Sequence, residues 1–295
     1  MKRSEFRLLD RLRVRWAEVD LQKIVFNGHY LMYFDTAVAA YWRAMALPYH
    51  ETMQALQGDL YVRKATLEYL GSAHYDDQLE VGIRCGRIGN SSMVLRGAVF
   101  RAEQCLVHGE LVYVFADPAT QTSLPVPAVL REILTAFEAG QAMTSVECSN
   151  WATLGEPARA IRQAVFVDEQ HIPAELVCDA ADETAVHAVA RNRMGLPLAS
   201  GRMVALEGAV VKIGRMATLP TVRSSGLGRQ VLQALMQAAR EQGAREVLLH
   251  VQGSAVPFYL RQGYVAQGPV FEEAGIPHQA MRCPCCLRVN ARLRL

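Results

Sequence analysis

The glycine-rich turn Arg223-Ser-Ser-Gly226-Leu-Gly228 has the residue types and spacing of a ligand-binding turn. It lies between an apolar, strand-like run that ends at Leu219 and an amphipathic run that begins at Leu227 and predicts a helix. Backbone N–H groups at a helix start are free and lie at the positive end of the helix dipole, so they can hold a pyrophosphate. The turn therefore favours binding of a phosphorylated cofactor, although such a motif alone is more often a plain tight turn.

A second candidate is the carboxylate of Asp20, which precedes an apolar helix predicted over residues 28–45. The N–H groups at the start of that helix, near Asn27, Gly28 and His29, can polarise a carbonyl. A carboxylate held across from that carbonyl can act as a nucleophile or a base. An isolated aspartate in a loop is more often a turn former or a cap, so the surrounding residues decide between the two interpretations.

Length and composition limit the classes of protein to which the chain can belong. Its 295 residues suit two domains of about 140 residues each. The net charge of +2 is dispersed, which argues against a nucleic-acid surface. The charged start of the chain does not resemble a secretory signal, and no apolar run reaches the roughly 18 residues of a membrane span. Seven cysteines, an odd number, favour the reducing cytoplasm.

Two parts with different patterns are expected to flank a linker at residues 141–150. The domain prediction is 1–140 for the first part, 151–283 for the second and 284–295 for a tail. The tail contains Cys283-Pro-Cys285-Cys286, which has no partner pair at the spacing of a zinc site, so no metal is expected.

The first part predicts one buried helix and an antiparallel sheet. Residues 79–85 alternate between apolar and polar, and similar alternation recurs over 91–101 and 106–116. The helix stripe is wide and apolar, which indicates deep burial. Pro125 and Pro127 open a short helix that ends near Gly140.

The phrase Val14-Arg-Trp16-Ala-Glu18-Val-Asp20, continued through Asn27-Gly28-His29-Tyr30, resembles the YbgC and FadM group of hotdog-fold acyl-CoA thioesterases. The likeness covers most of residues 8–138 and implies a sheet wrapped on a central helix. It implies that Asp20 attacks an acyl-CoA thioester or activates water, and that Asn27, Gly28 and His29 line the substrate site. Glu18 is interpreted as a solvated or salt-bridged neighbour. The resemblance also implies a homo-oligomer with sites at subunit interfaces.

One residue departs from this pattern. The family usually has glycine where Lys23 stands, because glycine permits a tight bend. Lysine at this position either forces a different turn or reaches a phosphate of coenzyme A, and it leaves the hydrolytic activity open.

The second part predicts a helix over 156–169, strands over 186–191, 198–205 and 210–219, a helix after the glycine turn, a strand over 246–251 and a short helix over 255–261. This order, with Arg223-x-x-Gly226-x-Gly228 and Phe258-Tyr259-x-Arg261-x-Gly263-Tyr264, resembles the GNAT superfamily of N-acetyltransferases over roughly residues 146–282. The phrases Phe166-Val-x-Glu169-Gln170, Lys212-Ile-Gly-Arg215-Met216 and Phe271-Glu-Glu273-Ala-Gly275-Ile-Pro277-His278 resemble its ElaA-like branch. The implied fold is a mixed, splayed α/β sheet.

The GNAT resemblance implies acetyl-CoA as donor and an amine as acceptor. Tyr259 is expected to donate a proton to the leaving thiolate, and His278 to act as a base or line the acceptor pocket. Glu169 and His250 are weaker catalytic candidates, and for each a structural hydrogen-bonding role is favoured. His250 is a candidate only because it lies beside the expected cofactor strand. The expected cofactor-binding residues are Met216, Ala217, Arg223, Ser225, Gly226, Leu227, Gly228 and Arg229.

Three hypotheses follow. The first is a bifunctional α+β protein that hydrolyses an acyl-CoA and transfers acetyl from acetyl-CoA. The second keeps the transferase and makes the hotdog part a dimerising scaffold or an acyl-CoA sensor. In the third, neither part is catalytic and the GNAT part only senses acetyl-CoA. The acyl chain and the acceptor amine are not readable from the sequence.

Overall fold

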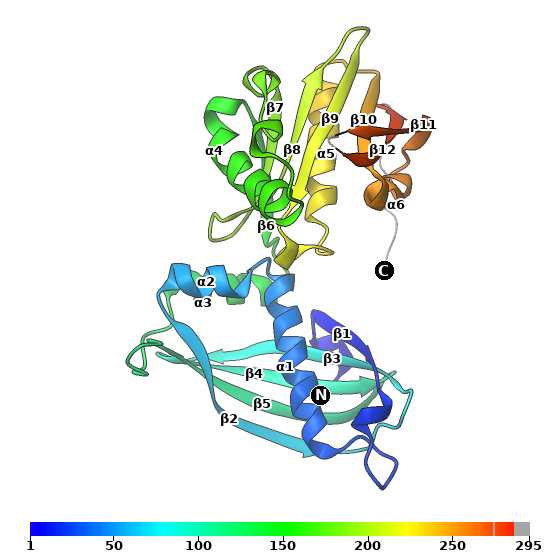
Figure 1. Ribbon diagram of the computed structural model, residues 1–295. Helices are drawn as coiled ribbons and strands as arrows, with labels where there is room; N and C mark the ends of the chain where they lie inside the picture. The colour runs from blue at the N-terminus through cyan, green and yellow to red at the C-terminus, as the bar shows by residue number, and fades with distance from the viewer. Residues whose placement is uncertain (274, 286–295) are drawn as a thin grey trace. The chain divides into compact units, whose positions relative to one another are not determined.

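A computed structural model describes residues 1–273 and 275–285 of the chain. The chain divides into two compact units, Met1–Met143 and Thr144–Leu295, and each is described by itself (Figure 1). Both units combine helices with a sheet, as the α+β prediction required. Among the described residues, no helix has the length and apolar character needed to cross a membrane.

The N-terminal unit is an antiparallel sheet in the order β1-β3-β4-β5-β2. Its strands are β1 (Leu8–Arg13), β2 (Asp59–Tyr69), β3 (Gln78–Ile88), β4 (Ser92–Arg101) and β5 (Gln104–Ala116). Helix α1 (Asn27–Ala44) packs against this sheet, and α2 (Tyr49–Leu56) and α3 (Ala128–Glu138) follow. The central helix on an antiparallel sheet confirms the hotdog prediction, and α1 begins within one residue of the expected position.

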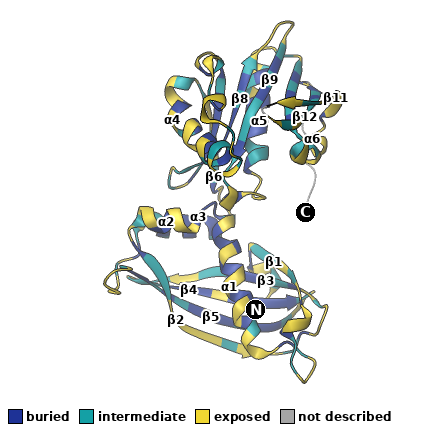
Figure 2. Cartoon of the chain, in the orientation of Figure 1, coloured by how far each residue is buried: buried dark blue, intermediate teal, exposed yellow. Residues whose placement is uncertain are grey.

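The buried side of α1 explains its place on the sheet. Its buried residues recur three and four positions apart, as an apolar stripe on a helix requires (Figure 2). Phe34 is fully buried, and a Cβ at Gly97 of β4 would lie 2.8 Å from its ring. Glycine at this position therefore lets α1 approach the sheet closely.

The C-terminal unit is a seven-stranded mixed sheet in the order β11-β12-β10-β9-β8-β7-β6. Only β9 and β10 pair in parallel among the described strands. The strands are β6 (Thr144–Ser149), β7 (Val186–Asn192), β8 (Pro197–Ala205), β9 (Val210–Thr218), β10 (Glu246–Gln252), β11 (Val265–Glu273) and β12 (Ile276–Pro284). Helices α4 (Trp151–Arg162) and α5 (Leu227–Glu241) cover opposite faces, and α6 (Val256–Arg261) precedes β11.

Two local differences from the sequence predictions stand out in this unit. Residues 144–149, inside the expected linker, form β6 and pair with β7 from Thr144–Asn192 to Ser149–His187. The helix expected over 156–169 begins at Trp151, because Asn150 caps it by accepting a hydrogen bond from the Thr153 N–H. It continues as a π-helical turn over Gln163–Glu169.

Candidate functional sites

The loop that carries Asp20 is held along its length by the loop between β2 and β3. The N–H of Val14 donates to the Asp77 carbonyl at 2.9 Å, and the N–H of Val25 donates to the Ala73 carbonyl at 2.8 Å. Ile24 and His74 form an isolated antiparallel bridge. These backbone bonds fix residues 14–26 as a defined arm that leads into α1.

Asp20 closes a tight turn in this arm. Its N–H donates to the Ile24 carbonyl and its own carbonyl accepts from the Lys23 N–H, both at 2.9 Å. Its Oδ1 accepts from the Gln22 N–H at 2.8 Å, and the described residues supply no hydrogen bond to Oδ2. The side chain is half-buried. One carboxylate oxygen therefore orients the side chain and the other is available to a substrate or water.

Lys23 adopts the left-handed conformation that the family's glycine would favour, with φ of 63°. The turn hydrogen bonds hold it there. Of the two alternatives left open for Lys23, a different turn is therefore not required.

Glu18 is buried rather than solvated, with 3% of its surface exposed. Its Oε2 accepts from the Arg15 N–H at 2.7 Å and from the Tyr33 hydroxyl at 2.8 Å, and its Oε1 accepts from Arg15 Nε at 2.7 Å. Burial alone would raise the pKa of Glu18, but the hydrogen bonds from Arg15 and Tyr33 outweigh it and the pKa is lowered. The salt-bridged alternative is thus the one seen, and it ties the arm to α1.

The start of α1 leaves backbone N–H groups beside this arm. The N-cap residue, Phe26, provides no side-chain cap, and its own N–H donates to the Glu18 carbonyl at 2.9 Å. The first-turn residues Asn27 and Gly28 are exposed. His29 is half-buried, and its Nδ1 contacts Met32 Sδ at 3.4 Å, which suits a wall residue better than a base.

An exposed apolar surface adjoins this helix start. It comprises Phe26, the N-cap of α1, and Leu31 and Met32 of that helix, with Tyr69 at the end of β2 and Leu70 after it. Tyr69 joins the two elements, because its hydroxyl donates to the Asn27 carbonyl at 3.1 Å. β2 is an edge strand, so both its backbone and these side chains are open to a second chain or an acyl group.

In the C-terminal unit, two residues of the glycine turn have left-handed backbone conformations. Ser224 has φ of 65° and Gly226 has φ of 87°. The Ser225 hydroxyl donates to the Val222 carbonyl at 2.6 Å, and α5 starts at Leu227 without a side-chain cap. Ser225 is exposed, and Gly228 and Arg229 are half-buried, so solvent reaches residues on both sides of the start of α5.

Arg223, which is expected beside a pyrophosphate, pairs with a carboxylate in the structure. Its guanidinium forms a bidentate ion pair with Glu169, at 2.7 and 2.5 Å, and its Nε donates to the Thr218 carbonyl at 3.1 Å. The hydrogen bond from Arg223 lowers the pKa of Glu169. Both residues therefore brace the turn against the π-helical segment, which agrees with the structural interpretation of Glu169.

The strands β9 and β10 separate where a cofactor arm is expected. They pair only from Val210–Glu246 to Ile213–Leu249. The pairing of β9 with β8 shifts register between Gly214 and Ala217, where Arg215 has φ of 52°. This bulge bends β9 and separates it from β10, so the sheet is splayed as predicted.

Met216 and Ala217 follow the bulge on opposite faces of β9. A Cβ added to Gly201 would lie 2.5 Å from Met216 Sδ and 2.8 Å from Leu235 of α5, so Met216 faces that helix. Ala217 is buried in the cluster under α4. Both side chains therefore pack toward a covering helix, and Ala217 is the more deeply buried of the two.

The two predicted acetyltransferase catalysts, Tyr259 and His278, lie on α6 and β12. Tyr259 is buried against the rings of Phe258 and Tyr264, with centroids 4.8 and 5.7 Å away. Burial raises the pKa of Tyr259 well above its usual 10.0, so the phenol keeps its proton. Nδ1 of His278 lies 2.8 Å from the Ile276 carbonyl and donates to it, which leaves Nε2 for a substrate. Among the described residues no hydrogen bond or ring contact joins Tyr259 to His278.

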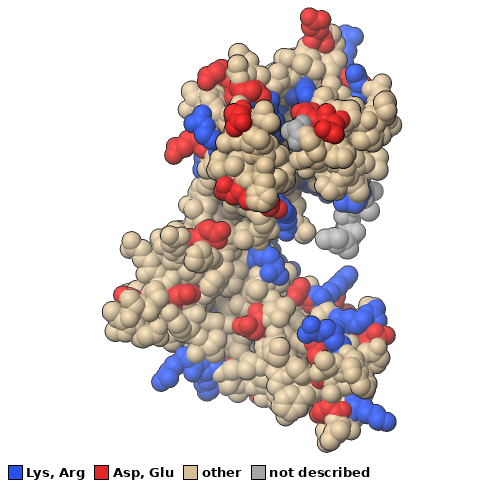
Figure 3. Space-filling view, viewed as in Figure 1, with Lys and Arg blue, Asp and Glu red and all other residues tan. Residues whose placement is uncertain are grey.

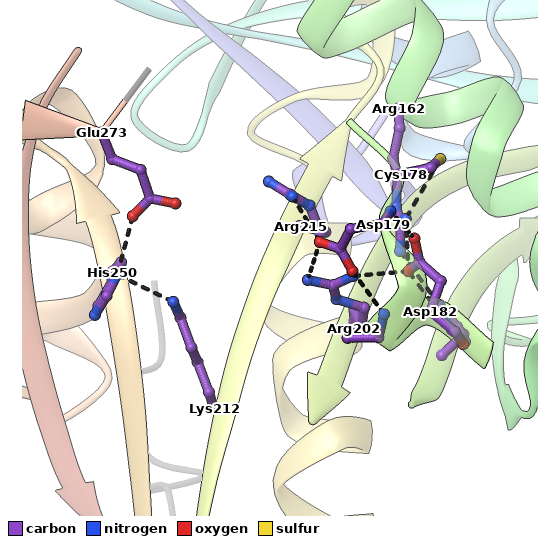
Figure 4. A network of polar contacts seen from close by, with 11 residues as sticks. Arg162, Cys178, Asp179, Asp182, Arg202, Lys212, Arg215, His250 and Glu273 are labelled. Atoms are coloured by element: carbon purple, nitrogen blue, oxygen red, sulfur yellow. Dashed lines mark hydrogen bonds and ion pairs between the residues drawn. The ribbon is translucent and has the colours of Figure 1, made fainter. Parts of the chain in front are cut away.

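Two polar networks contain residues of β9 (Figure 4). In the first, Asp179 accepts from Arg202 at 2.6 Å and from Arg215 at 3.0 Å. The hydrogen bond from Arg202, with that from Arg215, lowers the pKa of Asp179 to about 2. Buried Asp182 links Arg202 to Arg162, which is fully buried.

The second network joins Lys212, His250 and Glu273 from β9, β10 and β11. Neither Lys212 nor Glu273 was predicted as a site residue, although both stand in phrases that carried the GNAT resemblance. The sequence held that signal, but the register of three strands was needed to bring the groups together.

The remaining expectations concern charge, metals and the tail. On the face shown in Figure 3, Lys and Arg are interspersed with Asp and Glu rather than gathered in a basic stripe. Within residues 1–273 and 275–285, no three His, Cys, Asp or Glu side chains are grouped to hold a metal ion. Cys283 and Cys285 are buried, and Cys286 lies outside the described residues.

In comparison with known proteins, the two halves of the chain match different families. Residues 161–285 match the family described as Acetyltransferase (GNAT) domain, and residues 22–107 match the Thioesterase superfamily. The uncharacterized N-acetyltransferase YjcF of Bacillus subtilis is 38% identical over 122 residues, which are 41% of this chain and 86% of that protein.

Solved structures similar to each half are also known. An acyl-CoA N-acyltransferase from Pseudomonas aeruginosa is 31% identical with a TM-score of 0.43, over 47% of this chain and 98% of its own. A 1,4-dihydroxy-2-naphthoyl-CoA thioesterase from Synechocystis is 15% identical with a TM-score of 0.41. The match covers 43% of this chain and 95% of that thioesterase.

Proposed function

The chain belongs to the GNAT acetyltransferases through its C-terminal domain and carries a domain of the thioesterase superfamily before it, and from this premise we propose that it is a bifunctional enzyme of coenzyme A thioesters. The N-terminal domain hydrolyses an acyl-CoA, and the C-terminal domain transfers acetyl from acetyl-CoA to an amine. The finer resemblance, to the YbgC and FadM group and to the ElaA-like branch, is part of the proposal and rests on the motifs quoted above.

For acetyl transfer, the observation that carries the proposal is the break between β9 and β10 followed directly by the turn into α5. The strands part after Ile213 and Leu249, so the β9 backbone beyond that point can pair with an extended cofactor arm. The N–H groups from Ser225 to Arg229 then lie where the same strand ends, at a helix start that suits a pyrophosphate. Tyr259, protonated in its buried position, supplies the proton to the leaving thiolate.

For thioester hydrolysis, the proposal rests on Asp20 and the start of α1, which share one rigid arm. Oδ2 of Asp20 attacks the carbonyl or takes a proton from water, while N–H groups at Asn27 and Gly28 stabilise the developing oxyanion. The exposed apolar side chains of α1 and β2 receive the acyl chain or a second subunit. A homo-oligomer through β2 completes the site in this proposal.

A panel of acyl-CoA esters, followed by release of free coenzyme A, tests the hydrolase. Asp20→Asn should lower kcat by about 100- to 10,000-fold, the range for removal of a catalytic acid or base. Glu103→Gln, an exposed carboxylate of the same unit, is the control. Wild-type rates in Asp20→Asn would leave the hotdog domain as a scaffold or sensor, the second of our hypotheses.

Acetyl-CoA consumption with a panel of primary amines tests the transferase. Tyr259→Phe should keep cofactor affinity in calorimetry and lose most of its turnover. If intact, folded protein gives no binding heat with coenzyme A or its esters, the proposal fails for both domains.

A further inference from the structure

Two side chains converge on one ring nitrogen of His250 at the point where β9 and β10 part (Figure 4). Nδ1 of His250 lies 3.0 Å from Lys212 Nζ and 2.9 Å from Glu273 Oε2. His250 follows Leu249, the last β10 residue paired with β9. The side chains of His250 and Glu273 are 29% and 45% exposed, so a substrate can reach them.

The two contacts of Nδ1 cannot both be hydrogen bonds at once. A protonated Nδ1 donates to the Glu273 carboxylate, and Nε2 then carries a lone pair. An unprotonated Nδ1 accepts from the Lys212 ammonium, and in the neutral ring Nε2 then carries the hydrogen. Glu273 therefore favours a ring that can accept a proton at Nε2, and Lys212 favours a ring that cannot.

Building on the proposed acetyltransferase activity, we propose that His250 is the catalytic base for the acceptor amine, with Glu273 as its positioning residue and Lys212 as the opposing group. A carboxylate on one nitrogen of an imidazole fixes the tautomer and stabilises the imidazolium, as in other carboxylate–histidine pairs. His278 has only a backbone carbonyl at its Nδ1, so it lacks this support.

The groups packed around His250 come from the neighbouring strands and suit this role. The Phe271 ring of β11 meets His250 edge-on at 4.9 Å and stacks with His278 of β12 at 6.1 Å. Glu273 interacts electrostatically with Lys212, His250 and His278. Burial lowers the pKa of Lys212, and Arg202 and Arg215 add to this effect while Glu273 and Asp179 oppose it. A lowered pKa weakens the positive charge of Lys212 beside Nδ1. This favours the tautomer of His250 whose Nε2 can accept a proton.

The reaction balances with these groups. His250 Nε2 takes one proton from the acceptor ammonium and releases it to solvent. The free amine forms a C–N bond with the acetyl carbon, and the C–S bond breaks. The thiolate takes a proton from Tyr259, and the surplus proton on the new amide nitrogen returns to the tyrosinate. The net products are the acetylated amine, coenzyme A and one proton.

The test compares two nucleophiles with acetyl-CoA. An alkylamine such as benzylamine is an ammonium at neutral pH and needs a base, whereas hydroxylamine is largely unprotonated and does not. His250→Asn should lose about 100-fold in kcat/KM with benzylamine and change less than threefold with hydroxylamine. Calorimetry with coenzyme A checks that the variant is folded. Equal losses with both nucleophiles, or no loss with either, would overturn the assignment.

Opposite shifts in the pH profile separate a base from a structural residue. Glu273→Gln removes the anion that stabilises the imidazolium, so the acidic limb of kcat/KM should move to lower pH and the plateau should fall. Lys212→Met removes a cation, so the limb should move to higher pH and the plateau should not fall. Glu272→Gln, the adjacent carboxylate on β11, is the matched control and should match wild type. Parallel shifts in both variants contradict the proposal.

A readout independent of turnover distinguishes this inference from the proposed function. Imidazole ¹⁵N shifts of the free protein should show more Nδ1–H tautomer of His250 in Lys212→Met and less in Glu273→Gln. The inference fails if the tautomer of His250 is the same in both variants. The transferase proposal fails separately if wild type acetylates neither benzylamine nor hydroxylamine.

Discussion

Replacing Glu18 with Gln should destabilise the N-terminal unit by about 2 kcal/mol. The side chain is 3% exposed and receives three donors, the Arg15 N–H, Arg15 Nε and the Tyr33 hydroxyl. Glutamine keeps the shape but offers one acceptor oxygen and an NH₂ group in place of two acceptor oxygens. One donor must therefore face another donor, whichever way the amide turns.

The size of this destabilisation follows from the orientation of the glutamine amide that costs less free energy. Arg15 has 75% of its side chain exposed, so its guanidinium can turn to water when the NH₂ faces it. The lost ion pair with this exposed guanidinium contributes little, because solvent screens it. The two remaining hydrogen bonds lose their charge assistance, roughly 1 kcal/mol each, and relief from burying a charge offsets part of this. For a unit of this size, about 2 kcal/mol corresponds to a fall in Tm of about 6 °C.

Scanning calorimetry of the full chain measures this effect, with Glu103→Gln as the exposed control. Because the pKa of folded Glu18 lies below its ordinary 4.5, its contribution is fully present above that pH. It is lost as the pH falls through the lower folded pKa, so the difference between variant and wild type should shrink in acid. Acyl-CoA hydrolysis should also drop, because the hydrogen bond that ties the arm of Asp20 to Tyr33 loses its charge assistance. A Glu18→Gln protein that melts within 1 °C of the control would refute this reasoning.

Three further outcomes are expected. Lys23→Gly should stabilise the protein by about 0.5–1 kcal/mol in urea unfolding, since relief of a left-handed side-chain conformation exceeds the added chain entropy, and hydrolysis should persist; a loss of stability would mean that the lysine side chain contributes. Gly226→Ala, at φ of 87°, should cost about 1–2 kcal/mol and weaken coenzyme A binding in calorimetry, and unchanged affinity would argue against a cofactor at this turn. Asp179→Asn should lower acetyl transfer by freeing Arg215 at the bulge; the contribution of Asp179 to Tm should hold above pH 3.8 and disappear as the pH falls through about 2, and a pH-independent difference would contradict its ion pairs.

Strong local patterns allowed much of the fold to be predicted. The apolar stripe of α1 and the run after Gly226 both gave helices close to their observed bounds. β6 was missed because an edge strand is held by its backbone, and its side chains, half-buried or exposed, carry little apolar alternation. The early start of α4 was signalled by Asn150, whose role as a cap could have been recognised.

The sequence could suggest the local structure of a candidate site only where neighbours in sequence are also neighbours in space. The turn at Gly226 and the loop of Asp20 are local, so their shapes follow from short phrases. The partner of Arg223 is Glu169, 54 residues away, and no local pattern specifies that pair. His250 had no visible partner until the strand order placed Glu273 beside it. Such contacts depend on register, which periodicity does not determine.

The position of β6 decides how the two compact units can be studied apart. This strand begins at Thr144, directly after the residue that ends the first compact unit. A fragment that starts at residue 151 would lack β6, the edge strand of its sheet. The hydrogen-bonding edge of β7 would then be uncovered and could pair with another molecule. A fragment of the C-terminal unit should therefore begin before Thr144, so that it keeps β6 as its edge strand.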